Sequence, residues 1–418
     1  MPFQFPRVFG YRTGLLALGL GLLVPTVLAQ SSPYFVGGAV GLTRETNIFR
    51  AADGRPESDD TVTSVSLLAG VDQPIGRQRV FGRLNVRENR YAQSSLLNNL
   101  SYGVNAGLDW STLERLSGNL SLDASQNLAR FSPGDAPGTT ERNIEKSMGV
   151  AATVRVGVVT RMTAELGLSH REVDYSAPEF NFREYRQDAV SIGLQYQFSG
   201  SLGAGMLVRH TEGSFPLFRE IAPSVFIADT FKRDDAEINL RWTPGGASTI
   251  SARIAASDTR HKQAKQQDVN GVTGAVGWNW RPTGRLRLDT TLTRNTGLET
   301  TGFTLFNGLI TGQNDNSRLI TSLRVAAAYD LTGKIGLTAS ATHAQRSLSD
   351  TQALSFGQPV VNTGNDRSTS LALGVRWVPL RSLQLSCDVS QDSRTTSGTL
   401  SLPYGAGSAG CFAQFVLQ

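Results

Sequence analysis

Polar residues alternate with apolar ones in many segments of this chain, and the charged side chains of these segments fall on the polar parity. Arginine dominates the cations of this set, and aspartate and glutamate accompany it. The set comprises Arg83, Arg87, Arg155, Arg209, Arg241, Arg253, Arg287, Arg324, Arg376, Asp109, Asp123, Glu165, Glu237 and Asp289. Residues two apart on a strand share a face, so the set predicts a polar wall. Such a wall can form cross-strand ion pairs, the interpretation we favour, or an arginine excess can favour anions along a wet path.

The sequence offers little support for catalysis. The four histidines His170, His210, His261 and His343 fall near strand ends without neighbouring carboxylates, so they do not predict a metal site. Ser169 beside His170 is no catalytic pair by itself. The chain contains no phosphate loop, dinucleotide fingerprint or nucleophile elbow. We therefore expect no enzyme, cofactor or metal, and a lipid-modifying enzyme built into a barrel wall is a distant alternative.

Residues 100–124 show the element that must carry these charges. Apolar residues occupy the even positions from Leu100 to Trp110, and polar residues or glycine occupy the odd ones. After a short polar break the alternation restarts at Leu116. Each run predicts a strand of about ten residues with one apolar and one polar face. A single hairpin of this kind is not stable alone.

The same period recurs along the chain and predicts about 18 strands, an even number as in bacterial outer-membrane barrels. Residues 30–418 contain no apolar run of the roughly 18 residues that a transmembrane helix needs. Short turns alternate with longer segments such as 213–231 and 296–316, which we interpret as external loops. The predicted fold is an all-β, transmembrane, antiparallel up-and-down β-barrel of the bacterial outer-membrane type with a water-filled interior. A soluble secreted β-solenoid or sandwich is the alternative.

Aromatic residues fall in two groups. The tryptophans lie on the apolar parity at the ends of even strands and predict a girdle at the periplasmic interface: Trp110, Trp242, Trp278, Trp280 and Trp377. A second group, represented by Phe215, Phe218, Phe303 and Phe306, lies in the segments interpreted as loops. These rings could stack on sugars, but packing within long loops is the interpretation we favour.

Residues 1–29 predict a secretory signal. Arg7 and Arg12 precede an apolar run over residues 15–28, and Val27 and Ala29 suit cleavage. We therefore expect a signal peptide at 1–29 and the barrel at 30–418. Removal of two arginines lowers the formal net charge from +5 to +3. No Lys/Arg cluster remains in the mature part, so a nucleic-acid partner is not expected.

The two cysteines predict a disulfide. Cys387 and Cys411 share a parity on the last two strands, and the connection between them centres near residue 400. Opposed residues on antiparallel strands reach the Cα separation that a disulfide allows, and an exported protein meets an oxidising compartment. The alternative is a pair of small lipid-facing residues.

Two terminal motifs carry a resemblance to a known family. The opening GLTRETNIFR (41–50) and the ending GCFAQFVLQ (410–418) resemble the outer-membrane β-barrel proteins of exopolysaccharide biosynthesis clusters, the EpsL-type branch of a β-barrel porin family. The chain departs from outer-membrane barrels in ending on Gln418, so Phe415 would have to serve the assembly signal.

The resemblance implies a channel that forms or supports the export path of an extracellular polysaccharide. It implies as partners outer-membrane lipid, the barrel insertion machinery, periplasmic polysaccharide export proteins and the exopolysaccharide itself. It supplies no catalytic residues. A general diffusion porin or a surface scaffold is the alternative function.

Overall fold

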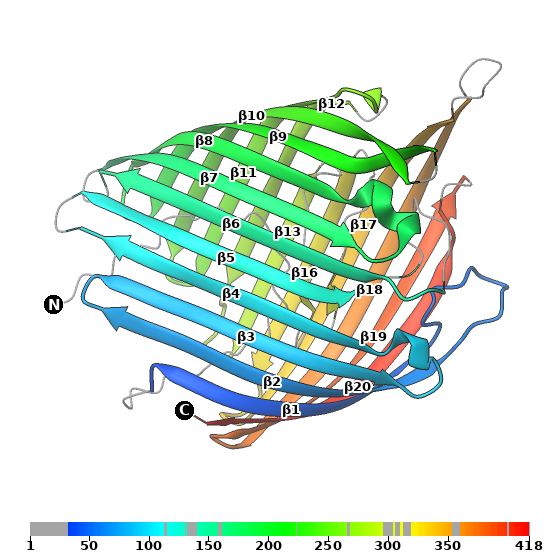
Figure 1. The fold of residues 1–418 in the computed structure, drawn as a ribbon. Coiled ribbons are helices and arrows are strands. Elements are labelled where there is room, and N and C mark those ends of the chain that lie inside the picture. The colour runs from blue at the N-terminus through cyan, green and yellow to red at the C-terminus, as the bar shows by residue number, and fades with distance from the viewer. Residues whose placement is uncertain are drawn as a thin grey trace.

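The alternating segments form strands that pair in sequence order, as the computed structural model shows (Figure 1). The structure describes residues 32–112, 115–129, 131, 140–157, 161–222, 224–265, 268–295, 304–305, 310–311, 319–352, 360–398 and 401–417. The predicted signal peptide at 1–29 lies outside this part.

Eighteen strands make one antiparallel sheet. Its first half consists of β1 (Tyr34–Glu45), β2 (Asp60–Ile75), β3 (Gln78–Tyr91), β4 (Asn99–Ser111), β5 (Leu116–Leu128), β6 (Ile144–Val156), β7 (Met162–Tyr175), β8 (Tyr185–Gln197) and β9 (Leu202–Ala222). The second half consists of β10 (Val225–Gly245), β11 (Ser248–His261), β12 (Val269–Trp280), β13 (Leu286–Asn295), β16 (Leu319–Asp330), β17 (Ile335–Gln352), β18 (Val360–Leu380), β19 (Leu383–Ser397) and β20 (Tyr404–Leu417). A separate two-stranded ladder joins β14 (Thr304–Leu305) to β15 (Ile310–Thr311).

The first and last strands close the sheet into a barrel. β1 runs antiparallel to β20, with Val36 opposite Leu417 and Glu45 opposite Ser408. Closure leaves no edge strand, so every strand of this sheet has hydrogen-bonded neighbours on both sides. The predicted all-β antiparallel barrel and its strand number are confirmed.

The two faces of the wall differ as the alternation predicts. Apolar side chains of one parity remain exposed, such as Leu67 and Ile238, each 68% accessible. Their neighbours in sequence, Ser66 and Glu237, are 5% and 2% accessible. Side chains on the concave side of a closed sheet crowd together, so the polar parity faces the lumen and the apolar parity forms the exterior.

The two ends of the barrel also differ. Tight turns close one end, for example between β2 and β3, where Gly76 has φ +62°. Longer connections and extended hairpins stand at the other end. Val36 and Leu417, which are paired, mark the tight-turn end, and short turns lie on the periplasmic side of such barrels.

The expectation of a long loop over residues 213–231 is wrong. β9 continues to Ala222 and β10 begins at Val225, so the segment is a tall hairpin with Ser224 at its tip (φ +63°). The ladder shifts register between Ile227 and Asp229. β8 pairs with β9 only as far as Ser214, so beyond that residue Pro216 costs no hydrogen bond to β8.

The end with the longer connections holds a small apolar cluster. Ile48, Leu97 and Phe131 pack together, and Phe49, Tyr91 and Leu128 contact them. Two short 3-10 helices, η1 (Ser95–Leu97) and η2 (Pro178–Arg183), lie in connections at this end. Among the described residues no helix has the length and apolar content to cross a membrane.

Candidate functional site: the barrel lumen

The predicted polar wall lies on the inward parity, where neighbouring strands bring opposite charges together. Arg155 on β6 and Glu165 on β7 face each other in the ladder, and the Arg155 Nε to Glu165 Oε2 distance is 2.7 Å. The two side chains are 9% and 6% accessible. Arg155 also donates a 3.2 Å hydrogen bond to Asn119 on β5. The chain thus builds a polar network across three strands.

Two acids each lie between two arginines. Glu237 Oε2 is 3.3 Å from Arg253 Nη1 and 4.0 Å from Arg209 Nη2, and the glutamate side chain is inaccessible to solvent. Asp330 lies 4.0 Å from Arg287 and 3.9 Å from Arg376. These pairs join different strands of the sheet. The ion-pair interpretation therefore describes this part of the wall.

Two other predicted wall residues, Asp123 and Asp289, pair with neutral amides, whereas Asp109 lies near an arginine. Asn105 donates a short hydrogen bond to Asp123, and Asn279 donates one to Asp289. Asp109 is 3.9 Å from Arg79. The remaining predicted residues, Arg241 and Arg324, occupy the inward parity of β10 and β16.

Two arginines of β3, Arg87 and Arg83, have no acidic partner among the residues that the structure describes. Arg87 donates a 3.1 Å hydrogen bond to the Ser66 hydroxyl and is 8% accessible. Arg83, four residues closer to the tight turn, is exposed. Within the described part of the chain, no ion pair or hydrogen bond involves its guanidinium. Arg83 is therefore a free positive charge on the lumen wall.

Sequence reasoning missed three inward-facing phenylalanines, Phe35, Phe81 and Phe412. Each ring lies over a glycine of the adjacent strand: Phe35 over Gly70, Phe81 over Gly107 and Phe412 over Gly41. The signal in the sequence was an aromatic residue on an otherwise polar parity. The glycine partners lie far from these phenylalanines along the chain, so the pairing becomes visible only through the register.

An aromatic cluster lies at the mouth with the long connections. Phe215 and Phe231 are 3% and 2% accessible, and their ring centroids are 5.6 Å apart. His261 packs 5.5 Å from Phe231, and its Nδ1 lies 2.7 Å from Asp229 Oδ2. Phe215 and Phe218 thus belong to strand β9 and not to a loop. Phe303 and Phe306 lie outside the described residues.

Buried carboxyls at this mouth have shifted pKa values. Burial raises the pKa of Glu145, although a hydrogen bond from Tyr175 and the charge of Arg171 oppose the shift. Burial would also raise the pKa of Asp60, but hydrogen bonds from the backbone N–H groups of Ser94 and Gln93 outweigh it and lower the pKa. Asp60 therefore anchors the connection between β3 and β4 as a carboxylate.

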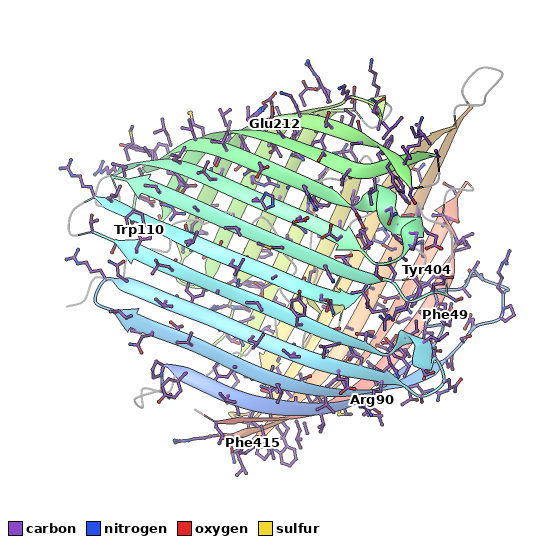
Figure 2. All side chains as sticks on the ribbon, in the orientation of Figure 1. Phe49, Arg90, Trp110, Glu212, Tyr404 and Phe415 are labelled. Atoms are coloured by element: carbon purple, nitrogen blue, oxygen red, sulfur yellow. A yellow bond between two sulfur atoms is a disulfide. The ribbon has the colours of Figure 1, made fainter. Side chains whose placement is uncertain are left out.

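The opening motif has a structural role at the same mouth. Asn47 is fully buried, and its amide contacts Ala51 and Gly405. Arg50 lies 5.9 Å from the ring of Tyr404 and 3.8 Å from Asp392. Figure 2 shows Phe49 and Tyr404 at this end of the barrel and Trp110 at the opposite end.

The tryptophans lie on the exterior at the tight-turn end. They stand at or near the ends of β4, β10, β12 and β18, and Trp242, Trp278 and Trp377 are 43%, 42% and 47% accessible. Trp278 and Trp280 stack with centroids 5.2 Å apart, and Trp278 Nε1 donates a 2.8 Å hydrogen bond to Ser248. An exterior apolar band ending in aromatic side chains suits a lipid interface.

Polar residues replace the apolar ones on the exterior near the other end. His170 Nδ1 lies 2.8 Å from Asp188, and His210 Nδ1 lies 2.6 Å from Asp234. The expectation that the histidines lack neighbouring carboxylates is therefore wrong, because their partners come from adjacent strands. Among the described residues, no group of three or more His, Cys, Asp or Glu side chains could hold a metal ion.

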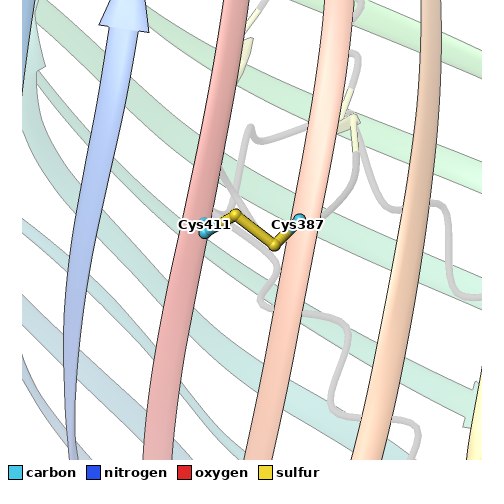
Figure 3. The surroundings of a disulfide bond; sticks show 2 residues. All are labelled: Cys387 and Cys411. Atoms are coloured by element: carbon cyan, nitrogen blue, oxygen red, sulfur yellow. A yellow bond between two sulfur atoms is a disulfide. The ribbon is translucent and has the colours of Figure 1, made fainter.

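The cysteines form the predicted disulfide. Cys387 and Cys411 oppose each other on β19 and β20, with Cα atoms 4.1 Å apart. Figure 3 shows the bridge between the two neighbouring strands. It lies on the exterior parity, beside Leu42 of β1.

These features together describe a bacterial outer-membrane barrel: a closed antiparallel sheet, an apolar exterior band and a polar interior. At 18 strands such a barrel is wide enough to hold an aqueous channel. The lumen is therefore the candidate functional site.

Comparisons with known proteins find similarity among solved structures. No family model matches the chain, and no curated protein sequence matches it. Solved structures similar to it include OccK9 (OpdG) of Pseudomonas aeruginosa, at 14% identity and a TM-score of 0.45 over 92% of this chain and 98% of that one. Another is the outer membrane channel DcaP of Acinetobacter baumannii, at 11% identity and a TM-score of 0.44 over 92% and 96%. At such low similarity, the fold assignment rests on the strand pairing of this chain itself.

Proposed function

We propose that the chain is a passive outer-membrane channel for small hydrophilic solutes. The observation that carries the proposal is the closed ring of 18 strands whose inward parity is polar and charged. A lumen of this width is not filled by side chains from the wall alone. The apolar exterior seats it in lipid.

The charge pattern supports weak ion selectivity. Several wall arginines lie against acids, as with Arg155 and Glu165, so much of the positive charge is neutralised locally. Arg83 lacks such a partner among the residues that the structure describes. Because charged residues along a pore tune its selectivity, we expect a modest preference for anions.

Conductance in planar bilayers tests this function. The refolded protein should give steady single-channel currents in KCl, and a salt gradient should give a reversal potential of the sign for anion preference. A protein that inserts into the bilayer but conducts no current would contradict the channel proposal. A cation preference would contradict only the selectivity.

The export role implied by the resemblance to exopolysaccharide-cluster barrels stays a prediction. An export pore would depend on periplasmic partners, whereas a diffusion channel conducts without them. The polar lumen suits either, and conductance of the purified chain alone would support the diffusion channel.

A further inference from the structure

Two of the inward phenylalanines lie close to the free arginine. Phe35 on β1 lies opposite Gly70 on β2, and Gly70 lies opposite Arg83 on β3. Phe81 precedes Arg83 by two residues and therefore shares its face. The three residues Phe35, Phe81 and Arg83 make one patch near the tight-turn end of the lumen.

The glycines make both rings lie along the wall. A Cβ atom at Gly70 would lie 2.6 Å from the Cζ of Phe35, and one at Gly107 would lie 2.9 Å from Cε2 of Phe81. Any larger residue would collide with the ring. Each ring therefore extends sideways over the neighbouring strand, and both phenylalanines remain partly accessible from the lumen.

A second arginine near the patch is already neutralised. Arg79 lies 5.5 Å from the ring centroid of Phe81. Asp72 accepts a 2.6 Å hydrogen bond from its Nε, and Asp109 lies 3.9 Å from its Nη1. Arg83 is therefore the cation of this patch that remains available to a ligand.

Rings over strand glycines can serve the fold alone, because they cover exposed backbone. Phe412 on β20 lies over Gly41 on β1 and is an example of a ring that only covers backbone. Phe412 lies opposite Gly41, which is six residues from Phe35 on β1. Since a strand rises by about 3.4 Å per residue, Phe412 is about 20 Å from Phe35. The patch at Phe35 and Phe81 differs from it by the exposed guanidinium of Arg83.

The spacing of the patch matches a short oligosaccharide. Gly70 on β2 lies opposite Arg83 on β3, and Arg83 lies opposite Asn105 on β4, two residues from Gly107. The two glycines are therefore about 12 Å apart, and so are the two rings that lie over them. A pyranose ring has an apolar face of C–H groups that an aromatic ring can cover. A sugar carboxylate can bind a guanidinium through two parallel hydrogen bonds.

We propose that Phe35, Phe81 and Arg83 form a binding subsite for an acidic saccharide on the lumen wall. The inference rests on the proposed channel function for its role, since the subsite would slow and select solutes that pass. The rings receive the faces of the first and third sugars of a trisaccharide. Arg83 receives a carboxylate between them.

The test uses trigalacturonate as the acidic probe and maltotriose as the neutral one. Current interruptions in planar bilayers report binding inside the pore, and titration calorimetry on the detergent-solubilised barrel reports binding without conduction. We expect trigalacturonate to bind more tightly than maltotriose. Arg83→Gln should weaken trigalacturonate binding about tenfold and leave maltotriose binding nearly unchanged.

The ring variants separate stacking from charge. Phe35→Leu with Phe81→Leu keeps an apolar cover over the glycines and should weaken binding of both probes. Phe412→Leu is the matched control, because it removes the same kind of ring where Arg83 is distant, and it should change neither. Equal affinities for the two probes, or an Arg83→Gln variant that binds like the wild type, would overturn the subsite.

The two proposals fail separately. A channel that conducts but does not distinguish the probes retains the proposed function and loses the subsite. A barrel that binds trigalacturonate in calorimetry through Arg83 but conducts no current retains the subsite and loses the proposed function.

Discussion

The side chain of Asn47 ties the first connection of the barrel to the last strand. Its Nδ2 donates a 2.9 Å hydrogen bond to the carbonyl oxygen of Gly405, and the two residues are 358 positions apart in the chain. The same amide makes two hydrogen bonds with the backbone of Ala51: Nδ2 donates to the carbonyl oxygen, and Oδ1 accepts from the N–H. The residue is fully buried and has φ +48°, a conformation that asparagine tolerates better than most residues.

Replacing Asn47 should loosen the closure of the barrel at this mouth. Asn47→Ala removes three hydrogen bonds and adds backbone strain, so we expect a loss of about 1–3 kcal/mol in the free energy of unfolding. Asn47→Gly is the control, because glycine adopts positive φ freely. Urea unfolding followed by tryptophan fluorescence measures both. Wild-type stability in the glycine variant would mean that backbone conformation, and not the hydrogen bonds, matters.

The disulfide between Cys387 and Cys411 should be present in the exported protein. Without reductant, the denatured chain should take up no iodoacetamide, and after reduction it should take up two adducts by mass spectrometry. The bridge has a sequence separation of 24, so the double variant Cys387→Ser, Cys411→Ser should lose about 3 kcal/mol of stability in the chain-entropy model. Two adducts before reduction would refute the bridge.

Alternation was sufficient to predict the wall of the barrel. A strand with one apolar and one polar face leaves little freedom in register, because a slip by one residue exchanges the faces. The shared parity of Cys387 and Cys411, together with a connection centred near residue 400, therefore sufficed to place them opposite each other, as the ladder has them. The alternation did not predict the tall hairpin of β9 and β10, because Pro216 and the register shift near Ile227 interrupt the period of two.

Cross-strand partners were the part that the sequence could not supply. Asp234 lies opposite His210, but they are separated by 24 positions, and the pairing depends on where the hairpin turns. The contact of Phe35 with Gly70 depends on the register across the connection 46–59 between β1 and β2. Such contacts belong to the ladder and not to any local pattern.

The pairing of His210 with Asp234 should make the stability of the barrel depend on pH. His210 follows Val208, the last apolar exterior residue of β9, and lies in an exterior group of charged side chains with Asp234, Glu212 and Lys232, where the apolar band gives way to polar residues. A hydrogen bond to Asp234, with a second to Glu212, raises the pKa of His210 above 6.5. Because the pKa of His210 is higher in the folded state, its interaction with the two acids stabilises the folded barrel. This contribution is fully present below pH 6.5 and is lost as the pH rises through the pKa of the folded state.

Histidine NMR of the folded barrel should show this raised pKa. Asp234→Asn replaces the charged acceptor of the first of these two hydrogen bonds with a neutral amide, so it should lower the pKa of His210 toward its ordinary value. An unchanged pKa in this variant would exclude Asp234 as the cause of the shift.

Glu237 should control both selectivity and stability of the lumen wall. Its side chain lies between Arg209 and Arg253 and has no accessible surface, so Glu237→Gln leaves two arginines without this countercharge at nearly constant volume. Reversal potentials should shift toward anions, and stability should fall by about 3 kcal/mol because a buried charge pair is broken. Asp109→Asn is the control: its side chain is 50% accessible and 3.9 Å from Arg79, so stability should change by less than about 1 kcal/mol. If both variants shift the reversal potential and stability equally, the position of Glu237 between two arginines has no special role.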